Sequence, residues 1–203
     1  GAYELRDVPP GDYTLTFSRS RYVTAPWRRG GGTGNATRLD VRAGADMTRM
    51  DAALIRAAAI AGRLTDELGD PLENAWVVAA RRGFDEQGPT FVTAAVGVTN
   101  DIGGYRISHL QPGQYYILAA ERSESFGSSP EADIGFARTA YPGTTDIRHA
   151  KLVTVATGQD LTGIDFSLVP APLGRIEGRV FASNGLAASN VRLMLQAIGN
   201  GPG

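Results

Sequence analysis

The chain repeats itself at a spacing the size of a whole domain. Residues 103–118 (GGYRISHLQPGQYYIL) have a near copy at 2–15 (AYELRDVPPGDYTL). Residues 151–171 likewise resemble 37–57, and 174–197 resemble 58–80. The offsets are about 100 to 116 residues, which suits tandem domains and is too long for a solenoid repeat.

The pattern within one repeat indicates strands. Alternating runs such as 60–66 (IAGRLTD) and 105–110 (YRISHL) are separated by clusters of Gly, Pro, Asn and Asp, as in antiparallel sandwiches. Residues 51–62 (DAALIRAAAIAG) could be read as a helix, but their repeat partner 164–178 (IDFSLVPAPLGRIEG) contains two prolines and would not be helical. We therefore predict an all-β fold of tandem antiparallel β-sandwiches.

The three alignments also set the expected domain boundaries. Residues 1–57 correspond to the C-terminal half of a sandwich repeat, 58–171 to one complete repeat, and 172–203 to the opening strands of a following repeat. Two explanations remain open. Either the chain is a fragment of a longer array, or the opening strands complete the half repeat in the same or a neighbouring chain.

Composition excludes several classes of site and partner. The 203 residues include no Cys, which excludes disulfides, thiolate metal sites and a Cys nucleophile. The net charge is −1, divided as +3 over 1–57, −6 over 58–171 and +2 over 172–203. Because nucleic-acid-binding proteins carry a clear basic excess, we expect no nucleic-acid partner. No run of roughly 18 apolar residues occurs, so no direct membrane insertion is expected.

The ordered motifs of the complete repeat resemble a known family. They are PLENAWV (71–77), TNDIGGYRI (99–107), LQPGQYYIL (110–118), YPGTTD (141–146) and VTVATGQDLTGIDFSL (153–168). Together they resemble the carboxypeptidase regulatory-like domain, in the tandem form found in bacterial cell-envelope proteins. The resemblance implies a seven-stranded transthyretin-like (Ig-like, Greek-key) sandwich that carries no catalytic zinc ligands. It also implies a secreted or cell-envelope location, although no signal peptide is present in this chain.

Candidate catalytic and metal-binding residues do not form known motifs. Asp66, Glu67, Asp70, Asn100 and Asp101 could ligate a hard cation, but EF-hand spacing is absent and turn formation explains them better. His109 and His149 lack the HExxH arrangement. Ser123, Ser125, Ser128 and Ser129 lie in a loop-like stretch without a GxSxG motif. We expect no metal, no cofactor and no enzymatic activity.

Aromatic side chains are the remaining candidates for ligand contact. Trp76 is expected to point away from the core because its neighbours Ala75 and Val77 align with inward positions. Trp27, beside Arg28 in a Gly-rich loop, aligns with Tyr141. A carbohydrate could stack on Trp27, Trp76 and Tyr141 with Arg28 nearby; alternatively, the aromatics anchor loops or contact a neighbouring domain.

The expected function is therefore non-catalytic. We predict a structural or adhesive module that contacts other copies of itself or neighbouring repeats. Head-to-tail assembly by strand complementation is one way in which it could do so. The alternative is a carbohydrate-binding module that uses the exposed aromatics to bind polysaccharide. A hydrolase on an unusual scaffold is the third and weakest reading, because fold resemblance alone does not decide function.

Overall fold

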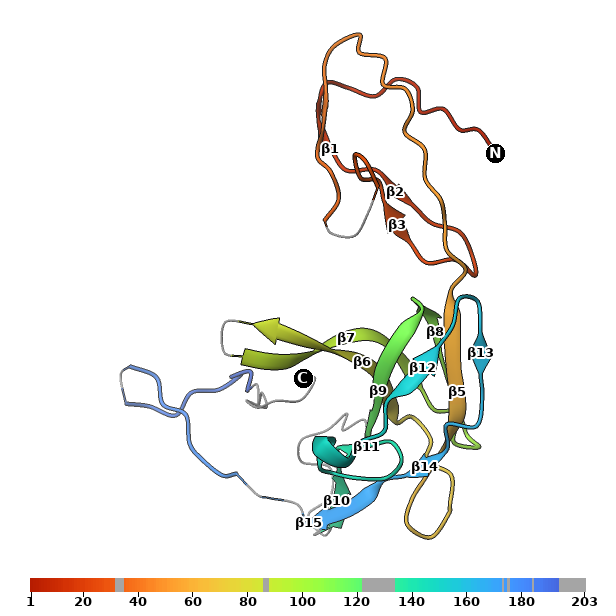
Figure 1. The fold of residues 1–203 in the computed structure, drawn as a ribbon. Helices are drawn as coiled ribbons and strands as arrows, with labels where there is room; N and C mark the ends of the chain where they lie inside the picture. Colours follow the sequence, from red (N-terminus) through yellow and green to blue (C-terminus); the bar gives the residue numbers. More distant parts are fainter. Residues whose placement is uncertain are drawn as a thin grey trace.

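The chain is all-β in the computed structural model (Figure 1). Among the described residues, the helical structure is confined to a single 3₁₀ turn, η1 (Ile147–His149), and no helix there has the length and apolar character needed to cross a bilayer. The structure describes residues 1–31, 35–85, 88–121, 134–172, 174, 176–183 and 185–193.

Residues 58–171 form a sandwich of two sheets. The first sheet has the order β11-β9-β6-β7, with β12 also paired to β9. The second is built on β5, which pairs antiparallel with β8 and parallel with β13 and β14. A short pair, β10–β15, lies beside them. The strands are β5 (Ala58–Thr65), β6 (Trp76–Asp85), β7 (Gly88–Val98), β8 (Gly104–Leu110), β9 (Gly113–Ala120), β10 (Ile134–Ala137), β11 (Thr139–Ala140), β12 (Val153–Val155), β13 (Asp160–Leu161), β14 (Phe166–Ser167) and β15 (Val169–Pro172).

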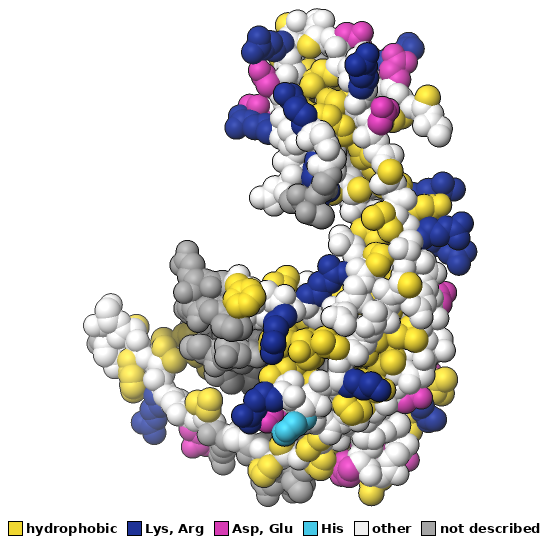
Figure 2. Space-filling view, viewed as in Figure 1, with side chains coloured by type: hydrophobic (Ala, Val, Ile, Leu, Met, Phe, Trp, Pro, Cys, Tyr) yellow, Lys and Arg dark blue, Asp and Glu magenta, His cyan; other side chains and the backbone are white. Residues whose placement is uncertain are grey.

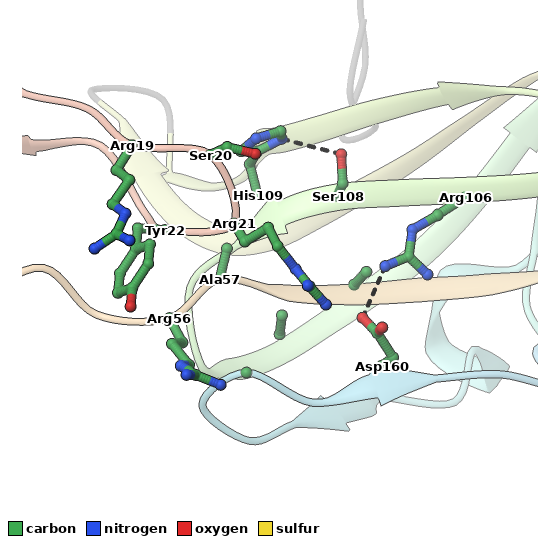
Figure 3. Close-up of a pocket in the computed structure, with 13 residues that line it drawn as sticks. Arg19, Ser20, Arg21, Tyr22, Arg56, Ala57, Arg106, Ser108, His109 and Asp160 are labelled. Carbon is green, nitrogen blue, oxygen red and sulfur yellow. Dashed lines mark hydrogen bonds and ion pairs between the residues drawn. The ribbon is translucent and has the colours of Figure 1, made fainter.

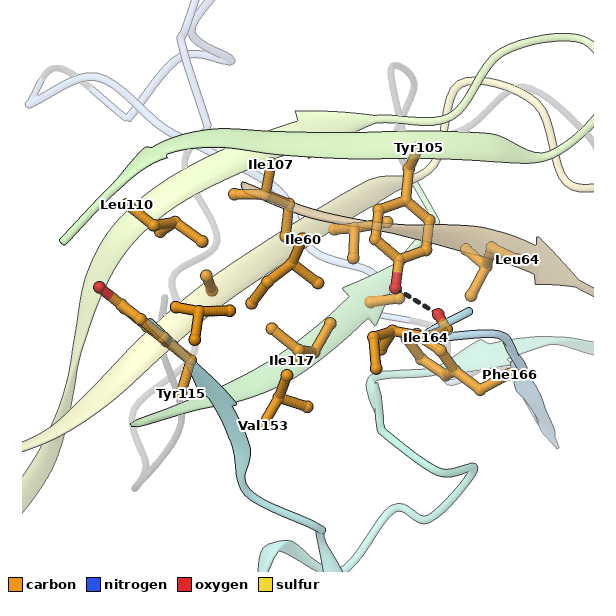
Figure 4. Packing of buried hydrophobic residues seen from close by; sticks show 14 of the residues in the cluster. Ile60, Leu64, Tyr105, Ile107, Leu110, Tyr115, Ile117, Val153, Ile164 and Phe166 are labelled. Atoms are coloured by element: carbon orange, nitrogen blue, oxygen red, sulfur yellow. Dashed lines mark hydrogen bonds between the residues drawn. The ribbon is translucent and has the colours of Figure 1, made fainter. Parts of the chain in front are cut away.

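A continuous apolar core lies between the two sheets (Figure 4). Alternate residues of each strand point inward, which places Ile60 of β5, Ile107 of β8 and Ile117 of β9 in contact with the core at 0–1% exposure. Tyr105 crosses the core and donates its hydroxyl hydrogen to the Ile164 carbonyl at 2.5 Å. Burial raises the pKa of this hydroxyl, which therefore stays protonated as a donor.

Residues 1–57 form a smaller unit next to one end of this sandwich (Figure 1). Its strands are β1 (Gly11–Tyr13), β2 (Thr16–Phe17), β3 (Ala25–Pro26) and β4 (Leu39–Val41), paired as β1–β4 and β2–β3. The Arg38 guanidinium binds Asp12 across the first pair and lowers the pKa of that carboxyl. Trp27 and Leu39 are the apolar residues that this unit buries.

The described residues after Pro172 have little regular structure. A bridge joins Phe181 to Ala187 around a turn at Gly185, and this segment lies apart from residues 1–57 (Figure 1). Its apolar side chains are exposed: Ile176 is 80% exposed and Leu193 is 81% exposed. Strand pairs between this segment and residues 1–57 do not occur in the described part of the chain.

Candidate functional site: an open sandwich face

The unit formed by residues 1–57 reproduces the strand pairs of part of the complete sandwich in the same register. In the sandwich, β9 pairs with β12 so that Gly113 opposes Val155. In the small unit, β1 pairs with β4 so that Gly11 opposes Val41. These are the positions that the repeat alignment makes equivalent, so the sequence repeat is also a structural repeat.

The tyrosines of the repeated motif make equivalent hydrogen bonds in both units. Tyr115 donates to the carbonyl four residues earlier, that of Gln111, at 2.6 Å, and Tyr13 does the same to Pro9 at 2.9 Å. The tyrosine that comes earlier in each motif donates to a carbonyl that is distant in sequence. Tyr3 donates to Met50 at 2.7 Å, which corresponds to the bond from Tyr105 to Ile164.

The aligned aromatics Trp27 and Tyr141 also occupy one shared position. Trp27 donates its backbone N–H to Leu15 at 2.7 Å, and Tyr141 donates its backbone N–H to Ile117 at 2.8 Å. Trp27 is only 9% exposed, and the Tyr141 ring packs edge-on against Phe166 at 5.9 Å. Both aromatics therefore anchor a loop to the strand it crosses.

The two units differ in what covers the repeated strands. In the complete sandwich, β5 and β6 cover the inner face, whereas residues 1–57 contain no equivalent of these strands. Leu5 is 65% exposed where its equivalent Ile107 is 0% exposed, and Tyr13 is 38% exposed where Tyr115 is 1% exposed. The small unit thus has a sandwich core without its covering strands.

This uncovered face is hollowed into a groove of about 1100 Å³, which we call the open face. Figure 2 shows hydrophobic side chains gathered on the surface of this unit. Exposed apolar surfaces of this kind mark sites of interaction with proteins, membranes or ligands. Its apolar lining includes Tyr3, Leu5, Val8, Phe17, Met47 and Leu54.

The residues predicted to stack on carbohydrate are not gathered at one place. Trp76 begins β6 opposite Val98 and is 48% exposed, on the face away from the core, as its alternation with Ala75 and Val77 predicts. Tyr141 packs against the core on the other side of the same sheet. Trp27 and the partly buried Arg28 belong to the small unit. Carbohydrate stacking on these four residues stays a prediction.

Two of the polar candidates, Asp66 and Asn100, stabilise turns with their side chains. The Asp66 carboxylate accepts from the backbone N–H of Leu68 and of Asp70, at 2.9 and 2.8 Å, and the Asn100 side chain accepts from Gly104 at 2.8 Å. Within the described ranges, no three His, Asp or Glu side chains are grouped closely enough to hold a metal ion. The four candidate serines, at 123, 125, 128 and 129, lie outside the described residues.

His109 and His149 lie in different settings. His149 ends η1, with its Nδ1 3.7 Å from the Asp146 carboxylate. His109 lies in β8 with φ +61°, and its Nδ1 is 3.0 Å from the Ser108 hydroxyl. The equivalent residue of the small unit, Asp7, has φ +57°. The positive φ therefore belongs to this position of the repeat and is adopted with either side chain.

Comparison with other proteins gives only distant likenesses. No protein-family model matches the sequence, and no curated protein matches it. The minor pilin GBS52 of Streptococcus agalactiae matches with a TM-score of 0.32 and 13% identity, over 86% of this chain and 66% of the pilin. Phospholipase PlaB of Legionella pneumophila matches with a TM-score of 0.32 and 12% identity, over 93% of this chain and 33% of PlaB. The structure of PlaB in complex with thio-NAD matches with a TM-score of 0.30 and 12% identity, over 90% of this chain and 34% of PlaB.

This chain therefore spans just under two thirds of the pilin structure and about a third of the phospholipase. TM-scores near 0.3 are too low to transfer a function or a detailed fold, so the functional argument rests on the open face itself.

Proposed function

We propose that this chain is a non-catalytic structural module whose open face binds the 176–193 segment of a second copy. The observation that carries the proposal is the exposure of residues 1–57 at positions whose equivalents are buried under β5 and β6. The module itself belongs with the carboxypeptidase regulatory-like sandwiches, and its place is a secreted or cell-envelope protein. Repetition of the contact from copy to copy gives a head-to-tail filament.

The sequence of 176–193 provides the side chains that the open face lacks. In the repeat alignment, Ile176 and Val180 take the places of Ile60 and Leu64 of β5, which are both 0% exposed. Leu193 takes the place of the fully buried Val77 of β6. The 176–193 segment, which we call the donor segment, therefore presents apolar residues at inward positions equivalent to those of β5 and β6, two of the three strands (β5, β6 and β7) that residues 1–57 lack.

Gly178 supports the same register. Its equivalent Gly62 lies so close to the Ile164 carbonyl that an added Cβ would be 2.0 Å from the oxygen and 3.0 Å from the Tyr105 hydroxyl. In the open face, Met50 supplies the carbonyl and Tyr3 the hydroxyl. Docking in the β5 register thus needs glycine at 178, although Gly178 has no neighbour within 4 Å in this structure.

The donor must come from another copy because of the reach of the chain. In the β5 register Ile176 lies opposite Leu5, by analogy with Ile60 opposite Ile107. Strand β15, which ends at Pro172, lies past the far end of β5 (Figure 1), and β5 alone extends about 23 Å. The four residues from Pro172 to Ile176 span at most about 14 Å, so a chain cannot fill its own open face.

Light scattering after size exclusion, over a range of concentrations, tests the proposal. The wild-type chain is expected to increase in mass with concentration beyond the 21.4 kDa monomer. Gly178→Val is expected to stay monomeric, because the added side chain would collide with the Met50 carbonyl. Gly174→Ala is the matched control, because its equivalent in β5 is Ala58. A monomeric wild type, or equal assembly by Gly178→Val, would contradict strand complementation.

Polysaccharide binding is the alternative function, and the exposure of Trp76 favours it. Val98 opposite Trp76 and the nearby Val96 are also about half exposed, which forms an apolar strip along β6 and β7. A polysaccharide pull-down that is lost in Trp76→Ala but kept in Val96→Ala would support stacking on the indole. Unchanged retention by both variants would leave the strip as a contact between protein domains.

A further inference from the structure

A cleft between the small unit and the complete sandwich gathers arginine side chains from three parts of the chain (Figure 3). Arg19 and Arg21 come from the loop between β2 and β3, Arg56 precedes β5, and Arg106 lies on β8. The cleft has a volume of about 450 Å³, which is within the usual range for a small-molecule site.

Backbone hydrogen bonds hold these arginines at the junction. Ala57 donates its N–H to the Arg21 carbonyl at 2.9 Å, and Gly158 donates to the Arg56 carbonyl at 3.2 Å. The isolated bridge between Tyr22 and Arg56 closes the loop onto the linker. The positions of Arg21 and Arg56 are therefore set by the same contacts that join the two units.

The charges in the cleft are not balanced. Among its described lining residues, Asp160 is the single carboxylate, and it is paired with Arg106 at 2.8 Å. Arg19 lies over the Tyr22 ring at 5.1 Å. No described residue forms a hydrogen bond or ion pair with the Arg21 or Arg56 side chain. A concave surface with unpaired like charges concentrates positive potential and favours an anionic ligand.

The groups around the arginines indicate which anion fits. Planar guanidinium groups bind carboxylates in a two-pronged geometry. The hydroxyls of Ser20 and Ser108 and the His109 ring also line the cleft, and such hydrogen-bonding groups suit sugar hydroxyls. The chain as a whole has a net charge of −1, which disfavours a long, densely charged polyanion such as DNA.

The geometry points to a binding site for an acidic saccharide, with sugar carboxylates held by Arg21 and Arg56 and sugar hydroxyls held by the serines and His109. This site adjoins the open face, because Arg19 and Tyr22 line both, but Arg21 and Arg56 line the cleft and not the open-face groove. It is separate from the aromatic residues at which sequence analysis predicted carbohydrate stacking.

Isothermal titration of the full chain with trigalacturonate at low salt tests the site. Maltotriose serves as the neutral saccharide of equal length. The double variant Arg21→Gln/Arg56→Gln is expected to weaken trigalacturonate binding at least about tenfold, because each lost charged contact contributes more than a neutral one. The control variant Arg63→Gln/Arg82→Gln, which makes the same charge change outside the cleft, is expected to bind within about twofold of wild type.

Several outcomes would overturn the proposal. Absence of trigalacturonate binding, or maltotriose binding of equal strength, would remove the acidic saccharide. Equal losses in the two double variants would show general attraction by net charge. Tighter binding of inorganic pyrophosphate or of a DNA dodecamer would assign the cleft to another class of anion. Equal melting temperatures of the two double variants establish that a loss is not due to unfolding.

Discussion

Residues 1–57 share their strand register and their tyrosine hydrogen bonds with the matching part of the complete sandwich. The inner face is covered in the complete sandwich and open in residues 1–57. Tyr105 is 4% exposed and Tyr3 is 49% exposed, although each donates to the equivalent carbonyl. The half sandwich therefore keeps its strand register and its tyrosine hydrogen bonds without the covering strands. Burial of its inner face requires the strands that come first in the repeat.

The largest expected difference between the two units concerns the apolar position they share. Ile107→Ala would leave a cavity in a packed core and is expected to lower the free energy of unfolding by about 2–5 kcal/mol. Leu5→Ala in the monomer is expected to change it by less than about 0.5 kcal/mol, because Leu5 is mostly exposed. Urea unfolding of both variants, kept monomeric by Gly178→Val, measures the contrast. Equal losses would mean that the open face is covered within one chain.

A smaller difference is expected for the two tyrosine hydroxyls. Tyr105→Phe leaves the buried Ile164 carbonyl without its partner and is expected to cost about 1–3 kcal/mol. Tyr3→Phe is expected to cost less in the monomer, because water can replace the hydroxyl at the exposed site. Thermal unfolding at low and high protein concentration checks this. The effect of Tyr3→Phe should grow with concentration if the donor segment buries Tyr3.

The smallest expected effect is a pH dependence that belongs to the complete sandwich. A hydrogen bond from the Arg148 side chain lowers the pKa of Asp146 from 3.8 to about 2. Because the folded-state pKa is depressed, this contribution to stability is complete above about pH 4 and is lost as the pH falls towards 2. Asp146→Asn should remove that part of the dependence in melting curves recorded from pH 5 to 2. An unchanged profile would show that the exposed pair contributes nothing.

The fold was largely predictable, because turn residues and alternation mark the strands. The runs at 60–66 and 105–110 lie in β5 and β8, and 51–57 contains no helix. Sequence did not predict that β13 and β14 run parallel to β5, because alternation does not encode strand direction. The short β10 and β11 were also missed, because two to four residues carry too little pattern.

The candidate site was predictable only in part. The repeat alignment indicated that covering strands were missing from 1–57, but the burial of Trp27 depends on contacts that spacing does not reveal. The arginine cleft was not predicted, because Arg21, Arg56 and Arg106 are far apart in sequence and meet only at the junction of the two units. The +3 charge of residues 1–57 was the available signal.

Disulfide trapping tests strand complementation most directly, because the chain contains no cysteine of its own. Antiparallel pairing in the β5–β8 register places residue 177 opposite residue 4, as Ala61 lies opposite Arg106. Directly opposed residues of antiparallel strands lie within the distance that a disulfide spans. The variant Glu4→Cys/Glu177→Cys is predicted to give a ladder of linked dimers and larger species after mild oxidation, abolished by Gly178→Val. Monomer alone, or a disulfide closed within one chain, would contradict the account.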